Sequence, residues 1–157
     1  MRLAAFLIGL FLVSTVWSGG VAVSRQVVYE GCRDIRGFPV ASLESPINNV
    51  AVAGLAPSGA PVIWYNPNIL SYFQPITRVF WYYHECAHHA LGHSFRNIPT
   101  LREKQADCWA IHTMSRRGLL RGRALAIIQS DLSRLSGDGW IYLPGPQRAM
   151  SLIACQG

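Results

Sequence analysis

The spacing of apolar residues changes from strand-like in the first half of the chain to helical in the second. Two short apolar runs at 49–54 and 60–66 flank a turn containing Pro and Gly, and this pattern predicts a β-hairpin. Pro61 and Pro67 near the ends of the second run predict that it lies at a sheet edge, because proline cannot donate to a neighbouring strand.

Three segments beyond the hairpin carry apolar residues at helical spacing. They cover about 74–91, 100–117 and 123–135, and each is followed by a glycine typical of a helix C-terminus. A short fourth helix is expected after Pro146, toward Cys155. The chain is thus predicted to fold as an α+β domain that is mainly helical, with a small antiparallel sheet or hairpin beside the first of these helices.

The N-terminus has the three parts of a secretory signal peptide. Arg2 is followed by an almost continuous apolar run and then by small residues up to Ser24. We assign residues 1–24 to this leader and residues 25–157 to a single domain. The alternative is a retained membrane anchor, because residues 3–23 carry no charge and roughly 20 apolar residues span a bilayer. An uncleaved leader is the only membrane contact that we expect.

Composition and charge narrow the class of protein. Half of the 157 residues are hydrophobic, which excludes a disordered chain, and no Gly triplet period indicates a collagen-like one. Fourteen Lys and Arg against eight Asp and Glu give a net charge of +6. Four arginines form a loose basic cluster, namely Arg116, Arg117, Arg121 and Arg123. We interpret this cluster as a solvated helix end with cations near its C-terminus, so no nucleic-acid partner is expected.

Four cysteines, all outside the predicted leader, indicate two disulfide bonds. An even number of cysteines is typical of exported proteins, so a periplasmic or extracellular location is expected. No Cys-x-x-Cys pair is present, which argues against a zinc site made of these residues. The spacing leaves all three pairings of Cys32, Cys86, Cys108 and Cys155 open.

The segment that carries chemistry is an H-E-x-x-H motif inside the first predicted helix. His84 and His88 are four residues apart, so both imidazoles project from one helix face and can share a metal ion. Two histidines and a carboxylate form a common catalytic zinc set, which leaves one position for water. Glu85 lies beside that face and is placed to take a proton from the water.

Such a metal needs a third ligand. The metzincin pattern places a histidine six residues after His88, but Ser94 stands there. Glu103 on the following helix is the other candidate, and Asp107 one turn later is placed to accept the outer N–H of a ligand histidine. Two structural roles compete with these assignments, because Glu103 also completes a capping box with Thr100, and Asp107 fits a solvated helix face.

The two motifs together, H-E-x-x-H at 84–88 and E-x-x-A-D at 103–107, resemble the gluzincin metallopeptidases of the CAAX prenyl protease and HtpX type. The resemblance covers roughly 62–110, with a weaker match at 144–153, and implies a zincin-like metallopeptidase domain. It implies zinc ligands His84, His88 and Glu103, a catalytic base Glu85, and an orienting carboxylate Asp107. The chain lacks the further hydrophobic spans of the membrane members, so it is closer to compact secreted members and their substrates do not transfer.

The resemblance also bears on the disulfides. If the two motif helices pack on one metal, Cys86 and Cys108 lie at similar depth along them, within reach of each other. We therefore expect a Cys86–Cys108 bond, which leaves Cys32 to pair with Cys155.

Several other residues near the motifs receive structural interpretations. His89 and His93 lie about 140–180° around the helix from the first motif histidine, so surface or helix-end positions are expected for them. The aromatic residues 80–83 are interpreted as core residues rather than a substrate platform. Tyr142 and Arg148 are both candidates to stabilise an oxyanion, and the spacing singles out neither.

These residues predict a zinc metallopeptidase acting on a peptide or protein substrate. Glu85 takes a proton from a metal-activated water and passes it to the leaving amine. The run at 62–65 is expected to pair with an extended peptide, which favours an endopeptidase. The alternative is a disulfide-stabilised secreted binding protein with a structural or vestigial zinc site. Glu85 favours the enzyme, because a structural site needs no base between its ligands.

Overall fold

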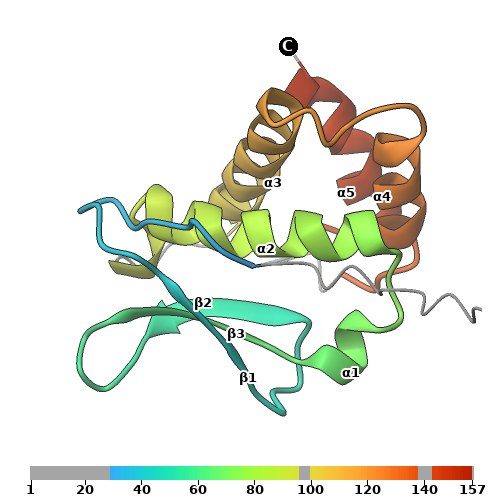
Figure 1. The fold of residues 1–157 in the computed structure, drawn as a ribbon. Coiled ribbons are helices and arrows are strands. Elements are labelled where there is room, and N and C mark those ends of the chain that lie inside the picture. The colour runs from blue at the N-terminus through green and yellow to red at the C-terminus, as the bar shows by residue number, and fades with distance from the viewer. Residues whose placement is uncertain (1–28, 96–99, 138–142, 157) are drawn as a thin grey trace, which may run out of the picture.

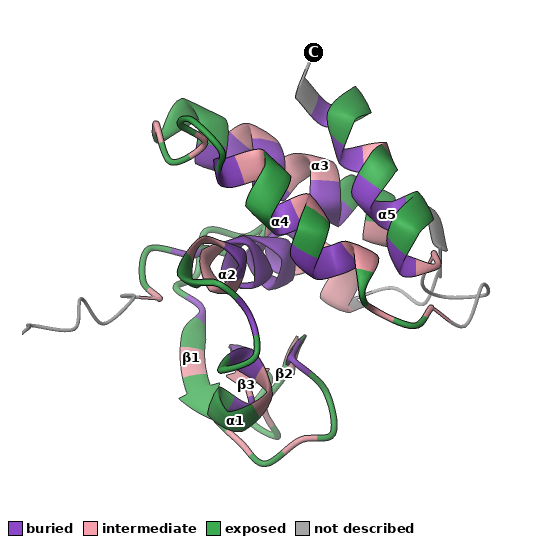
Figure 2. Ribbon diagram, turned by 90° about the vertical axis from the view of Figure 1, so that its right-hand side faces the viewer, coloured by how far each residue is buried: buried purple, intermediate pink, exposed green. Residues whose placement is uncertain are grey.

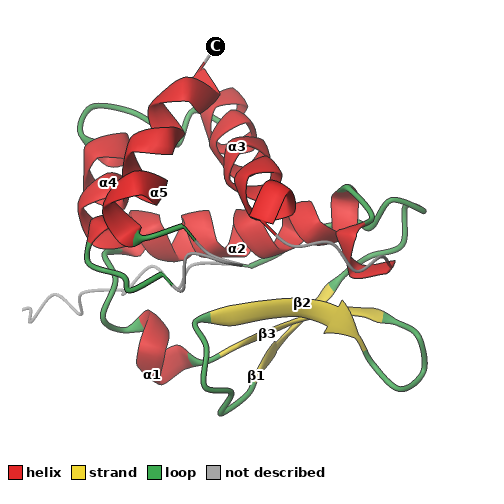
Figure 3. Cartoon of the chain, turned by 180° about the vertical axis from the view of Figure 1, so that it is seen from behind, coloured by secondary structure: helices red, strands yellow, loops and turns green. Residues whose placement is uncertain are grey.

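The structure is a computed structural model that describes residues 29–95, 100–137 and 143–156. A small sheet lies on one side of helix α2 (Pro75–Ala90), and the other long helices lie on the opposite side (Figure 1). Viewed from behind, α3 (Thr100–Arg116) packs near one end of α2, while α4 (Ala124–Ser133) and α5 (Gly145–Ser151) lie side by side toward the other end (Figure 3). The motif helix α2 is therefore the central element of an α+β fold.

The sheet has three strands in the order β1-β3-β2, namely Ala41–Glu44, Pro61–Tyr65 and Ala51–Leu55. β2 and β3 pair antiparallel with Ala53 opposite Ile63, which confirms the predicted hairpin. β1 pairs parallel with β3 on its other side and was not predicted. The expectation that the second run forms a sheet edge was therefore wrong. Pro61 is only the first residue of β3, where a missing donor is tolerated even in an inner strand.

The helices follow the predicted spacing closely. α2, α3 and α4 correspond to the three long predicted segments, and α5 to the short fourth one. Gly92, with φ 75°, ends the α2 region because its left-handed backbone turns the chain away from the helix. Two short elements were not predicted, namely α1 (Pro67–Leu70) and the 3₁₀ turn η1 (His93–Phe95). The 3₁₀ turn η2 (Leu152–Gln156) continues the predicted fourth helix toward Cys155.

Helix α2 is buried along most of its length because the sheet covers one side and the helices cover the other (Figure 2). The four aromatic residues at 80–83 are all buried, which confirms their predicted place in the core. Phe80, Ile128 and Leu152 are fully buried on the helical side. The buried carboxylate of Asp131 in α4 accepts the Gln74 backbone N–H at 2.9 Å, which ties α4 to the start of α2.

The two disulfides are Cys32–Cys86 and Cys108–Cys155, so the expected Cys86–Cys108 bond was wrong. Cys86 is two residues from His84 and thus about 200° around the helix, on the side away from the motif imidazoles. Each bond instead fastens a terminal segment of the described chain to one motif helix.

Two disulfides indicate an oxidising, extracytoplasmic environment. Within the described residues, no helix has the length and apolar character needed to cross a membrane. The predicted leader at 1–24, with its alternative as an anchor, lies outside the described residues.

Candidate metal centre

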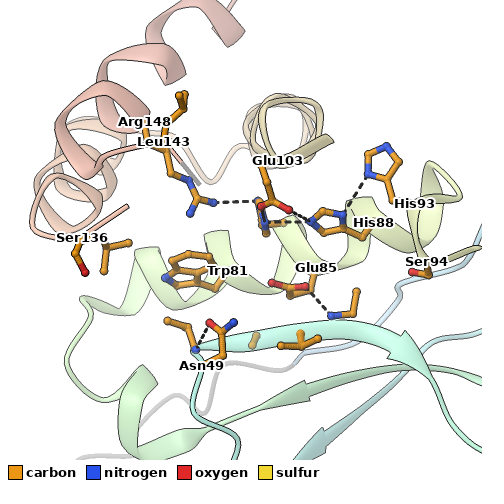
Figure 4. A pocket seen from close by; sticks show the side chains of 16 residues that line it. Asn49, Trp81, Glu85, His88, His93, Ser94, Glu103, Ser136, Leu143 and Arg148 are labelled. Carbon is orange, nitrogen blue, oxygen red and sulfur yellow. Dashed lines mark hydrogen bonds and ion pairs between the residues drawn. The ribbon is translucent and has the colours of Figure 1, made fainter. Parts of the chain in front are cut away.

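Three predicted ligands meet where α3 packs against α2 (Figure 4). His84 and His88 project from one face of α2, and their Nε2 atoms lie 3.2 Å apart. Glu103 approaches from α3, with its carboxylate oxygens 3.2 Å from His84 Nε2 and 3.5 Å from His88 Nε2. One ligand atom from each residue lies within 4.8 Å of the others. The three side chains therefore form a group that could hold a metal ion.

The chemistry of these donors fits a divalent metal. His84 Nδ1 donates to Asp107 Oδ1 at 2.8 Å, so the unprotonated Nε2 of the neutral ring faces the other two ligands. Glu103 Oε2 is buried and lies 3.2 Å from His84 Nε2, which has no N–H to donate when the ring is neutral. In that state this oxygen has no hydrogen-bond partner among the described residues. A buried carboxylate oxygen usually has a partner, and a metal ion can fill that role. Nitrogen and oxygen donors in this number match a zinc site with an open position.

Asp107 is held by an arginine from the far end of the chain. Arg148 on α5 donates from Nε to Asp107 Oδ2 at 2.9 Å and from Nη2 to Oδ1 at 2.7 Å. Burial alone would raise the pKa of Asp107, but Arg148 and His84 outweigh it and lower that pKa to about 2. Asp107 is thus a buried, ionised partner of His84 rather than part of a solvated face.

From the sequence, Arg148 is a candidate for oxyanion stabilisation. It is 41 residues from Asp107 along the chain, so no local sequence pattern predicts the ion pair that the structure shows. The other candidate, Tyr142, lies outside the described residues.

The two ligand histidines have pKa values shifted in opposite directions. Burial alone would lower the pKa of His84, but hydrogen bonds with Asp107 and Glu103 raise it to about 9. Burial and the neighbouring His84 charge lower the pKa of His88 to about 3. The pKa of Glu103 is also lowered, because the two histidines outweigh the effect of its burial. At neutral pH the metal-free centre therefore carries its proton on His84.

We expect metal binding at pH 7 to release about one proton, because His84 must be neutral to act as a ligand. The release should fall toward zero as the pH rises through about 9, where His84 loses its proton in the metal-free protein. Calorimetric titration with zinc in buffers of different ionisation enthalpy measures this number. A binding enthalpy at pH 7 that is the same in every buffer would contradict the assignment.

Glu85 lies between the metal centre and the sheet (Figure 4). Its Oε2 accepts the backbone N–H of Ala53 in β2 at 2.7 Å. Burial raises the pKa of the Glu85 carboxyl above its ordinary value, because the charged form is poorly solvated there. The hydrogen bond to β2 fixes one carboxylate oxygen and leaves Oε1 available for a proton.

A cavity of about 320 Å³ opens onto these residues. Its walls come from the metal ligands, from β2 and the residues before it, and from η1. The residues just after α4, the residue Leu143 before α5, and Arg148 on α5 complete the lining. The candidate ligands and Glu85 therefore line one and the same cleft.

Of the two other histidines of this region, His93 lies partly exposed just beyond the end of α2, as expected, whereas His89 is not a surface residue. His89 is fully buried, donating from Nε2 to the Val62 carbonyl at 3.0 Å and accepting the Ser94 hydroxyl at Nδ1. His93 lines the cleft, with its Nδ1 3.2 Å from His88 Nδ1. A metal-binding His88 would donate its outer N–H to His93. The turn at Gly92 returns His93 to the motif, which helical spacing alone does not predict.

No model of a known protein family matches the chain, and neither a curated protein nor a solved structure matches it. The resemblance to gluzincin metallopeptidases therefore rests on the motifs at 84–88 and 103–107 and on the centre that they form.

Proposed function

We propose that the protein is a zinc-dependent peptidase that cleaves internal bonds of extended peptides. His84, His88 and Glu103 would hold the metal, and Glu85 would act as general base. The observation that carries the proposal is the convergence of these three ligands in a cleft, beside a buried carboxylate held in place by β2.

Each residue of the site would have a distinct role in the reaction. When bound, zinc would polarise the scissile carbonyl and lower the pKa of a water molecule. Glu85 would take a proton from the attacking water and return it to the leaving amine. Asp107, clamped by Arg148, holds His84 with its unprotonated nitrogen toward the metal.

The outer edge of β2 offers a place for the peptide backbone. The carbonyl of Val50 and the N–H of Ala56 form backbone hydrogen bonds on the side of β2 that faces β3. Alternation along the strand turns the backbone groups of Ala51, Ala53 and Leu55 to the outer edge, as the bond from Ala53 to Glu85 illustrates. An extended peptide can pair there by main-chain hydrogen bonds. This assignment replaces the run at 62–65, which is an inner strand.

The competing function is a binding protein with a structural zinc site. A structural site has four protein ligands, whereas a catalytic site keeps one position open. The group formed by described residues has three ligands and opens onto the cleft. This arrangement favours the enzyme.

Replacing Ala53 by Pro tests how Glu85 is held. The substitution removes an N–H that faces away from β3, so the sheet ladder should persist. We expect kcat to fall about tenfold with zinc affinity unchanged, because one hydrogen bond that orients the base is lost. Steady-state kinetics and metal titration of the same sample measure both.

Leu55→Pro is the matched control, because it removes an outward N–H that is proposed to pair with the peptide but does not contact Glu85. It should therefore raise KM and leave kcat near wild type. Equal losses in the two variants would contradict the role of Ala53. A zinc-loaded wild-type chain without peptide hydrolysis would contradict the proposed function itself.

A further inference from the structure

Trp81 presents an unusual polar atom in the wall of the cleft. Its side chain lies one turn before His84, and the residue is 6% exposed. The indole Nε1 is buried and has no hydrogen-bond partner among the described residues. A buried tryptophan N–H usually finds a partner, and this one belongs to a residue that lines the cleft.

Arg148 places a second set of donors beside the indole. Its guanidinium carbon lies 4.8 Å from the centre of the Trp81 ring, and Figure 4 shows the guanidinium above the indole. Nε and Nη2 are engaged by Asp107, whereas Nη1 has no hydrogen bond to a described residue. Arg148 is 5% exposed and lines the same cleft.

The rest of this end of the cleft also supplies donors. Asn49 Oδ1 accepts the Val50 backbone N–H at 2.8 Å, which leaves the amide nitrogen of Asn49 free to donate. Ser136 adds a hydroxyl on the same side, away from His93 (Figure 4). The carboxylates among the described lining residues are those of Glu85 and Glu103, and both belong to the metal centre.

We propose that this end of the cleft, which we call the Trp81–Arg148 subsite, binds a carboxylate of the substrate. The inference rests on the proposed function, because it places the carboxylate next to the bond that is cleaved. The carboxylate accepts from Trp81 Nε1 and Arg148 Nη1, and charge-assisted hydrogen bonds of this kind are stronger than neutral ones. It comes either from an Asp or Glu side chain beside an internal bond or from the C-terminus of a peptide, and the second source would make the cleaved bond a terminal one.

Four acetylated tetrapeptides separate these sources. They share three residues and differ in the last, Glu or Gln, and in the terminal group, carboxylate or amide. Calorimetry on the metal-free chain measures their binding without interference from carboxylates that ligate zinc. We expect the Gln amide peptide to bind about tenfold more weakly than at least one of the singly acidic peptides. The acidic peptide that gains the affinity identifies the terminus or the side chain as the source.

Trp81→Phe removes the N–H and keeps an aromatic ring beneath Arg148, so it should abolish the preference without weakening the neutral peptide. Trp109→Phe, at a half-buried tryptophan that does not line this cleft, is the control and should keep the preference. Thermal melting of both variants establishes that they fold.

Equal binding of all four peptides would overturn the subsite, as would a preference that survives in Trp81→Phe. The same peptide pairs then serve as substrates for measuring kcat/KM of the zinc-loaded chain. Where needed, they are lengthened past the Glu or Gln so that a bond on that side can be cleaved. A carboxylate preference in binding without hydrolysis of any peptide would retain the subsite and reject the peptidase.

Discussion

Glu85→Gln is expected to lower kcat for peptide hydrolysis by on the order of 10³-fold while zinc stays bound. Gln has the shape of Glu, and its side-chain oxygen can still accept the Ala53 N–H that holds Glu85. The variant therefore keeps the position of the side chain and loses only the ability to take up a proton. Steady-state kinetics and zinc content measured on one preparation separate the two effects.

Glu44→Gln is the matched control for this change. Glu44 lies on β1 with an exposed side chain that accepts the Tyr65 hydroxyl, away from the cleft. Its replacement should leave kcat and zinc content as in the wild type. Full activity in Glu85→Gln would exclude this residue as the general base.

Glu103→Gln should weaken zinc binding by more than about 100-fold. Loss of an outer hydrogen-bond partner of a metal ligand typically costs 10–100-fold, and Glu103 is itself a proposed ligand. A neutral amide also carries no negative charge to balance the positive charge of the metal. Competition with a chromogenic chelator measures the affinity, and circular dichroism reports whether α3 stays helical.

The same substitution separates the two roles considered for Glu103. Gln still serves in a capping box, so a purely capping residue would show unchanged zinc affinity in the variant. The structure instead places the carboxylate against both imidazoles, with its oxygens 3.2 Å from His84 Nε2 and 3.5 Å from His88 Nε2. Unchanged affinity would remove Glu103 from the ligand set.

The local part of the site was predictable because helical spacing encodes it. Two residues that are four apart in a helix share one face, so His84 and His88 do. A short connection to α3 brings Glu103 back to that face. Helix ends were predictable for a similar reason, since glycines such as Gly92 mark them. These features depend on residues that are close in sequence.

The remainder depends on contacts between distant segments. β1 was missed because its sequence, Ala-Ser-Leu-Glu, carries little strand signal and its pairing with β3 is set by the fold. Arg148 reaches Asp107 only because α5 returns to the motif helices. The disulfide prediction considered how deep Cys86 and Cys108 lie along their helices but not which way each points. Direction around a helix would have argued against that bond.

Titrating the metal-stripped chain with zinc while following hydrolysis of a broad peptide library tests the central claim most directly. The account predicts that hydrolysis rises in proportion to bound zinc and reaches its plateau at about one zinc per chain, as a single centre of three protein ligands requires. A chain that binds its full equivalent of zinc and cleaves no peptide in the library would contradict it.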